Sequence, residues 1–184
     1  MARLVYYGMH GTVWKAIEKK SGEVVALKKM CGAFQSDADT RRTCREITFL
    51  KGFAGHPNII HLLHLHKAHN INHIYLTFEY METDLHLVIH AGILEDQHKK
   101  FIIYQLLKAI KYIHSAQVIH RDLKPSNLLL NSECILKVSE FCLAQFVGVP
   151  QNDGPTPTIT DYSGTRWYLA PEVLLGCTSY TKAV

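Results

Sequence analysis

The chain has 184 residues, of which 47% are hydrophobic and 20% charged, and its formal net charge is +4. This length suits one domain with a sizeable core, and the composition is that of a globular protein. The charge is too small and too dispersed to indicate nucleic-acid binding, and no segment approaches the unbroken apolar length that spans a bilayer. The first residues lack the apolar core of a signal peptide, so we expect a cytoplasmic or nuclear compartment, with reduced thiols at the scattered cysteines Cys31, Cys44, Cys134, Cys142 and Cys177.

Two apolar and β-branched runs, residues 4–7 and 12–17, flank a glycine-containing turn and predict a β-hairpin. Gly8, Gly11 and Val13 have the spacing of a phosphate-binding glycine loop, in which glycines let backbone amides approach a phosphate closely. Tyr6 stands where such a loop has its first glycine. An ordinary turn explains the same pattern, so the hairpin alone does not decide between the two interpretations.

Residues 23–28 read as a strand that ends in the candidate phosphate ligand. The run from Val25 to Lys28 matches the V-A-I-K element, whose lysine holds the phosphates of a nucleotide, and Ala26 lies two residues before that lysine. Lys29 points to the other face of the strand, where a solvated charge is the ordinary interpretation. A helix is expected from Ser36 or Asp37 to Leu50. Within it, Glu46 either pairs with Lys28 or is a solvated surface glutamate.

Two further strands, over residues 59–66 and 71–78, are expected to complete a small sheet. Five histidines crowd this region and raise the alternative of a zinc site. His61 and His64 would point to opposite faces of a strand, however, so surface histidines are favoured. The five are His61, His64, His66, His69 and His73.

Residues 78–84 turn polar and connect this sheet to the rest of the chain. Backbone groups of Glu79 and Met81 could bond the edge of an adenine, and Asp84 is a further nucleotide-binding candidate. The longest helical pattern covers residues 95–115, and its apolar side chains are spread around most of the circumference. Such a helix is normally buried on several sides. These side chains are Phe101, Ile102, Ile103, Leu106, Leu107, Ile110 and Ile113.

The most specific motif follows this helix: His120-Arg121-Asp122-Leu123 with Asn127 is the spacing of the protein-kinase catalytic loop. In phosphoryl transfer Asp122 would accept the proton of the substrate hydroxyl, Lys124 would face the charge on the phosphoryl oxygens, and Asn127 would hold a magnesium ion. A polar turn between a helix and a strand explains neither these residue types nor their order.

Short strands are expected over residues 127–130 and 135–138, with Leu129 as the apolar floor under an adenine. Glu140 then stands where kinases carry the magnesium-binding aspartate of D-F-G. It keeps the charge but is longer by one methylene, and magnesium tolerates a displaced oxygen poorly because it demands near-octahedral geometry. Cys142 replaces the glycine that lets this segment bend.

The series Lys28, Glu46, Asp122 and Asn127, followed by Thr160-Asp161-Tyr162 and Ala170-Pro171-Glu172, resembles the mitogen-activated protein kinase family. Four segments are most similar to its atypical extracellular-signal-regulated branch, namely residues 22–26, 45–48, 81–85 and 165–168. The resemblance implies an α+β fold of two lobes, with a small β-rich N-lobe of one helix in residues 1–80 and a partial helical C-lobe in residues 81–184. It also implies a Ser/Thr kinase that uses ATP and Mg2+ and is phosphorylated at Thr160 and Tyr162, by an upstream kinase or by itself. Its partners would be protein substrates rather than nucleic acid or membrane.

Several family positions are altered, and they support an alternative function. Besides Tyr6, Glu140 and Cys142, Gln145 and Leu169 replace arginines that help to bind the phosphorylated loop in the family. The family's large lobe also continues beyond the residues that this sequence contains. The alternative is therefore a truncated pseudokinase that binds a nucleotide or a partner without catalysis. A fragment with no stable fold is a third possibility.

Overall fold

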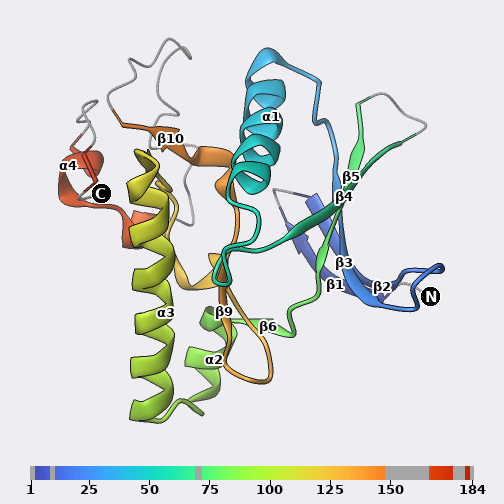
Figure 1. Cartoon of the computed structure of the whole chain (residues 1–184). Coiled ribbons are helices and arrows are strands. Elements are labelled where there is room, and N and C mark those ends of the chain that lie inside the picture. Colours follow the sequence, from blue (N-terminus) through green and yellow to red (C-terminus); the bar gives the residue numbers. More distant parts are fainter. Residues whose placement is uncertain (1–2, 9–10, 69–71, 148–165, 176–180, 183–184) are drawn as a thin grey trace.

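A computed structural model describes residues 3–8, 11–68, 72–147, 166–175 and 181–182. It contains a β-sheet with one helix packed near it and a second part built from helices and short strands (Figure 1). The sheet and helix α3 lie on opposite sides of the view, with α1 and β9 between them. The expected α+β fold, with a β-rich N-lobe and a partial helical C-lobe, is confirmed.

The N-lobe sheet has five antiparallel strands in the order β1-β2-β3-β5-β4. The expected hairpin and sheet are present, but Ile59 and Ile60 do not belong to β4. Ile59 instead bridges to Val138, and the N–H of Ile60 donates to the oxygen of Val138 at 3.0 Å, because both isoleucines are buried against the C-lobe. The strands are β1 (Arg3–Gly8), β2 (Gly11–Ile17), β3 (Val24–Met30), β4 (Leu62–Lys67) and β5 (Ile74–Glu79).

The register of the sheet gathers the nucleotide-binding candidates on one face. Val13 pairs with Lys28, and Lys28 pairs with Leu76. Directly opposite residues of antiparallel strands share a face, as do residues two apart on a strand, so Ala26 lies on this face too. Leu76 is fully buried, so this face of the sheet points into the protein.

Helix α1 (Asp37–Gly52) brings a carboxylate to the same side of the sheet. Its first turn is capped by Ser36, whose hydroxyl accepts a hydrogen bond from the N–H of Asp39 at 3.1 Å. The acidic residues Asp37 and Asp39 also suit the positive end of the helix dipole. The buried side of the helix carries Glu46 together with Phe49 and Leu50.

The C-lobe begins with a helix that the sequence analysis did not predict, α2 (Leu85–Ala91). The Asp84 carboxylate caps its first turn by accepting from the N–H of Leu87 at 2.9 Å, and Gly92, with φ of 66°, ends it in the left-handed conformation. The remaining elements are β6 (Thr83–Asp84), α3 (Asp96–Ser115), β7 (Val118–Ile119), η1 (Pro125–Asn127), β8 (Leu128–Leu130), β9 (Leu136–Val138), η2 (Phe141–Leu143), β10 (Gln145–Phe146), η4 (Arg166–Tyr168) and α4 (Pro171–Leu174).

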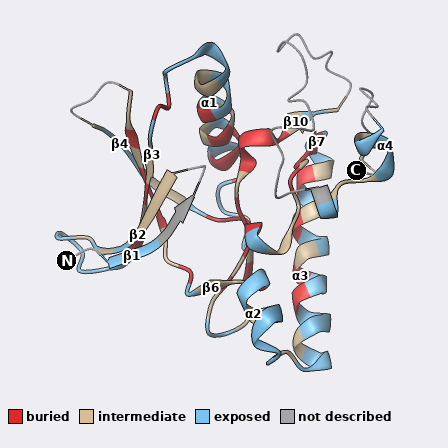
Figure 2. Cartoon of the chain, turned by 180° about the vertical axis from the view of Figure 1, so that it is seen from behind, coloured by how far each residue is buried: buried red, intermediate tan, exposed pale blue. Residues whose placement is uncertain are grey.

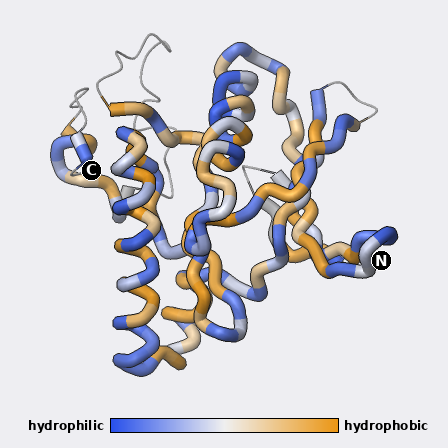
Figure 3. Tube along the Cα trace, viewed as in Figure 1, coloured by the Kyte–Doolittle hydropathy of each residue, from blue (hydrophilic) through white to orange (hydrophobic). Residues whose placement is uncertain are grey.

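Helix α3 is buried along one side only, so the expectation of burial on several sides is wrong within the described residues. Ile102, Ala109 and Ile113 are buried, and Figure 2 shows the rest of the helix as mainly exposed or intermediate. The reason is that α3 packs chiefly against β7 and β9. Hydrophobic residues nevertheless occur along its whole length (Figure 3). The exposed ones are Phe101, Ile103, Tyr104, Leu107 and Tyr112.

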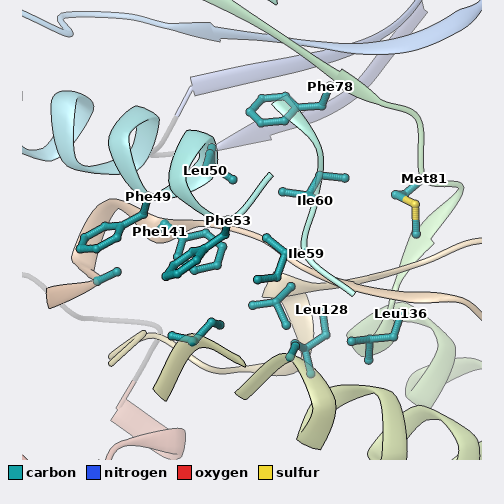
Figure 4. Close-up of a cluster of buried hydrophobic side chains, with 14 of the residues drawn as sticks. Phe49, Leu50, Phe53, Ile59, Ile60, Phe78, Met81, Leu128, Leu136 and Phe141 are labelled. Atoms are coloured by element: carbon teal, nitrogen blue, oxygen red, sulfur yellow. The ribbon is translucent and has the colours of Figure 1, made fainter. Parts of the chain in front are cut away.

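A continuous hydrophobic core joins the two lobes. Phe53, directly after α1, lies 5.9 Å from Phe49 and 5.6 Å from Phe141 between ring centroids (Figure 4). Beside these rings, Gln105 of α3 ties the lobes together: its Oε1 accepts from Asn58 Nδ2 and from the N–H of Leu136, both at 3.0 Å. The expected boundary at residue 80 therefore crosses a shared core, and the division into two domains stays a prediction.

Candidate active site

Lys28 lies between two carboxylates. Its Nζ is 2.8 Å from Glu46 Oε1 and 2.8 Å from Glu140 Oε1. The three side chains come from β3, α1 and the residue before η2, segments that are far apart in the sequence. The structure thus brings Glu46 to Lys28, as the sequence analysis expected, and adds a contact with Glu140 that it did not foresee.

The charges of this trio depend on one another. Burial lowers the pKa of Lys28, but the combined attraction of Glu140 and Glu46 outweighs it and raises that pKa well above its ordinary value. Burial raises the pKa of Glu46, the charge of Lys28 lowers it, and the neighbouring carboxylate of Glu140 raises it again. With both carboxylates ionised, one ammonium faces two negative groups, and the trio has a net charge of −1.

Glu140 is held in an unusual backbone conformation, with φ of 64° and ψ of 69°. Such left-handed geometry is uncommon for a residue with a side chain and often marks a functional site. The neighbours fix it: the N–H and the hydroxyl of Ser139 both donate to the oxygen of Asn127 at 3.0 Å, and Phe141 is fully buried. Cys142, where a bend had been expected, lies instead in η2 without a positive φ, and burial raises the pKa of its thiol.

The catalytic-loop candidates converge on the carboxylate of Asp122. Its Oδ2 accepts from Asn127 Nδ2 at 2.8 Å and lies 3.2 Å from Lys124 Nζ. The same nitrogen of Asn127 donates to the backbone oxygen of Asp122, also at 2.8 Å. Asp122 is buried, and its Oδ1 has no hydrogen-bond partner among the described residues. Two side chains therefore fix one oxygen and leave the other without a donor.

His120 supports this loop from below. Its Nδ1 accepts from the N–H of Asp122 at 3.2 Å, so its Nε2 carries the proton and donates to the oxygen of Ser139 at 2.8 Å. Burial lowers the pKa of His120, which favours this neutral form. Its ring also lies edge-on against Phe141, at 4.9 Å between centroids. His120 thus links the catalytic loop to the segment that carries Glu140.

The expected phosphate-binding turn contains a glycine that no other residue can replace without strain. Gly11 has φ of 119°, and a Cβ there would lie 2.1 Å from the backbone oxygen of Lys29. Gly8 pairs with Gly11 across the hairpin, and Val13 is half-buried on the inner face. The backbone of the turn is therefore compatible with a close approach by a ligand.

The expected adenine-binding residues lie along the connection between the lobes. Met81 is buried, and Leu129 of β8 pairs with Asp84 of β6. The N–H of Glu79 donates to the oxygen of His61 at 3.3 Å, and its carboxylate lies 2.9 Å from Lys137 Nζ. Glu79 thus braces the sheet, and the carboxylate of Asp84 caps α2 rather than standing free.

Comparisons with known proteins identify this site. Residues 3–184 match the family model of the protein kinase domain. The chain belongs to the protein kinase family. It is 58% identical over 178 residues to extracellular signal-regulated kinase 2 of Dictyostelium discoideum, 54% over 178 residues to mitogen-activated protein kinase 15 of Xenopus laevis and 52% over 179 residues to that of Mus musculus. The expected resemblance to mitogen-activated Ser/Thr protein kinases is thereby confirmed. Each alignment covers 96% of the chain but only 48%, 30% and 32% of the relative, so the chain spans about half of their length or less.

The residues of this kinase site do not fit the expected magnesium position. Glu140 Oε1 bonds to Lys28, and Asn127 uses its amide nitrogen to hold Asp122. Magnesium needs several oxygens in a near-octahedral arrangement. Within the described ranges, no three His, Cys, Asp or Glu side chains gather into a group suited to a metal. Glu140 therefore serves Lys28 in this structure.

The histidines near β4 and β5 have separate surroundings. His64 Nε2 is 3.7 Å from Glu18 Oε1, and His73 Nδ1 accepts from the N–H of Gly32 at 3.2 Å. His69 lies outside the described residues, as do the expected phosphorylation sites Thr160 and Tyr162. In the part of the chain that is described, no helix is both long and apolar enough to cross a bilayer.

Proposed function

We propose that this chain carries an ATP-dependent site that transfers the γ-phosphoryl group to Ser or Thr hydroxyls of protein substrates. The observation that carries the proposal is the arrangement around Asp122, whose Oδ2 is fixed by Asn127 and Lys124 while Oδ1 has no donor. A carboxylate oxygen that is buried and lacks a donor suits the acceptance of a hydroxyl proton.

The mechanism follows from this geometry. A Ser or Thr hydroxyl that donates to Asp122 Oδ1 is aligned for attack, and the carboxylate accepts its proton as the new phosphate ester bond forms. Lys124, 3.2 Å from Asp122 Oδ2, places a positive charge where the transferred phosphoryl oxygens gather charge. Asn127 holds Asp122 at two points and so limits misorientation, which can cost on the order of a hundredfold in rate for about 1 Å.

The inner face of the N-lobe sheet suits the nucleotide. Val13 and Ala26 offer half-buried apolar surface above, and Leu129 offers it below. The phosphates would extend toward the Gly8–Gly11 turn and the ammonium of Lys28. Family members generally use ATP with Mg2+, and no step here depends on the metal because the residues do not fit it.

The alternative of a non-catalytic binding module finds no support in the comparisons. The relatives named above are all described as kinases. The residues that would carry transfer, Asp122, Lys124 and Asn127, are also in mutual contact in the structure. Phosphorylation at Thr160 and Tyr162, by an upstream kinase or by the chain itself, and a cytoplasmic or nuclear location belong to the same proposal.

The test is phosphate transfer from γ-labelled ATP to a generic Ser/Thr protein substrate by the 184-residue chain. Asp122→Asn removes the proton acceptor and should lower the rate by about 100-fold or more. Asp96→Asn is the matched control, because Asp96 is an exposed residue at the start of α3. Equal rates for the Asp122→Asn variant and the unmodified chain would contradict the proposal.

A further inference from the structure

We propose that Glu140 is a built-in competitor for the phosphate-binding lysine: its carboxylate occupies Lys28, and a nucleotide must displace it in order to bind. The inference rests on the nucleotide site of the proposed function and adds a control on that site. It assigns Glu140 the role of a counterion of Lys28 in place of the magnesium ligand expected from its position in the motif.

The two carboxylates on Lys28 are equally close but differ in access. Both lie 2.8 Å from Nζ, yet the side chain of Glu46 is 2% exposed and that of Glu140 is 23% exposed. A ligand from solvent therefore reaches the Glu140 side of the ammonium first. Glu46 stays as the permanent partner, and Glu140 is the partner that a phosphate can replace.

The backbone directs Glu140 at Lys28. Ser139 is bonded to the oxygen of Asn127 on one side, and Phe141 packs against His120 and Phe53 on the other. With both neighbours fixed, the left-handed conformation of Glu140 sets where its side chain begins. The contact with Lys28 is thus built into the fold of this segment.

The length of the side chain matters for this contact. An aspartate at the same position would withdraw the carboxylate by up to about 1.5 Å, the length of one carbon–carbon bond. From 2.8 Å, such a withdrawal takes the oxygen beyond hydrogen-bonding distance of Nζ. The additional methylene of Glu140 therefore makes the ion pair possible.

Charge gives the contact its effect on binding. A lysine ammonium has three donors, and carboxylates take two of them here. The trio has a net charge of −1 when both glutamates are ionised, so an incoming phosphate meets repulsion from Glu140 at the position where it needs Lys28. Removal of this one negative charge should strengthen nucleotide binding.

The experiment is calorimetric titration of the full chain with ADP, with and without magnesium. In the absence of magnesium, Glu140→Gln should bind ADP at least fivefold more tightly than the unmodified chain. Glu133→Gln should bind as the unmodified chain does, because Glu133 lies on an exposed turn between β8 and β9. Magnesium should tighten binding by less than threefold in the unmodified chain and by more in Glu140→Asp, whose carboxylate is withdrawn from Lys28.

Two results would overturn the competitor role while the nucleotide site stands. One is unchanged or weaker magnesium-free binding in Glu140→Gln. The other is a tenfold or greater tightening by magnesium in the unmodified chain that Glu140→Gln abolishes, which would make Glu140 a metal ligand. Absence of ADP binding by every variant would instead overturn the proposed function, and the competitor role with it.

A second readout needs no nucleotide. Lys28→Met, Glu140→Gln and the double variant form a thermodynamic cycle whose unfolding free energies report the coupling between the two side chains. The inference expects the two effects to be non-additive. Additive effects would show that Glu140 does not hold Lys28 in solution.

Discussion

The amide nitrogen of Asn127 donates to both the backbone oxygen and the Oδ2 of Asp122, each at 2.8 Å. This double contact makes Asn127 a support of the proposed proton acceptor. Asn127→Ala should lower phosphate transfer by about 10- to 100-fold, since Asp122 loses its alignment. It should also lower the free energy of unfolding by about 1.5–3 kcal/mol, the usual range for a hydrogen bond to a charged group.

The control for this variant is Asn131→Ala. Asn131 also makes two side-chain hydrogen bonds, to the N–H groups of Glu133 and Ile135, but it lies in the turn after β8. It should lose stability without a specific loss of transfer by the folded protein. Equal losses of transfer in both variants would argue against a special role for Asn127.

Gly11→Ala should destabilise the hairpin by about 1–3 kcal/mol and weaken ATP binding. The reason is steric, since the new Cβ would meet the backbone oxygen of Lys29 at 2.1 Å and the φ of 119° suits only glycine. Gly52→Ala is the control, because nothing lies within 4 Å of a Cβ at the end of α1. Thermal unfolding and ATP titration of both variants check this, and similar behaviour of the two would refute it.

Phe141→Ala should cost about 3–5 kcal/mol of folding free energy. The ring is fully buried and touches both His120 and Fhe53's aromatic neighbour group in the core, so its loss opens a cavity where the lobes meet. Phe146→Ala removes the same side chain at a position that is 50% exposed and should cost clearly less. Denaturant unfolding of the two variants gives the comparison, and equal costs would contradict this view of the core.

His120 predicts a loss of stability in mild acid. Burial lowers its pKa in the folded state below the ordinary value of 6.5, so the unfolded chain binds more protons as the pH falls through that value. The free energy of unfolding should then decrease below about pH 6.5, by up to about 1.4 kcal/mol per pH unit for one proton. His120→Asn should flatten this slope between pH 7.5 and 5. An unchanged slope would assign the effect to other groups, such as His56, whose pKa burial also lowers.

The sequence allowed much of the fold to be predicted because its signals are local. The alternating apolar pattern marked β3, the Ser36 cap and acidic first turn marked α1, and helical periodicity marked α3. Helix α2 was missed although Asp84 and Gly92 bracket it as a cap and a stop, because the seven residues between them are too few for clear periodicity.

The contacts that shape the site were harder to foresee because they join distant residues. Glu140 and Lys28 are 112 positions apart, and no local pattern shows that the longer side chain reaches the lysine. Asn58 and Gln105, 47 positions apart, form a buried amide contact that only the packed structure reveals. Motif spacing identified Asp122, Lys124 and Asn127, but which oxygen of Asp122 they hold depends on side-chain geometry.

The most direct test of the account is thermal unfolding of the 184-residue chain with and without ATP. The account predicts one cooperative transition, because the core is continuous between the lobes, and a rise in its midpoint with ATP. Saturation at 100 times the dissociation constant should add about 2.7 kcal/mol of stability. The rise should be larger in Glu140→Gln. A cooperative transition that ATP leaves unmoved in both proteins would contradict the nucleotide site on which the account depends.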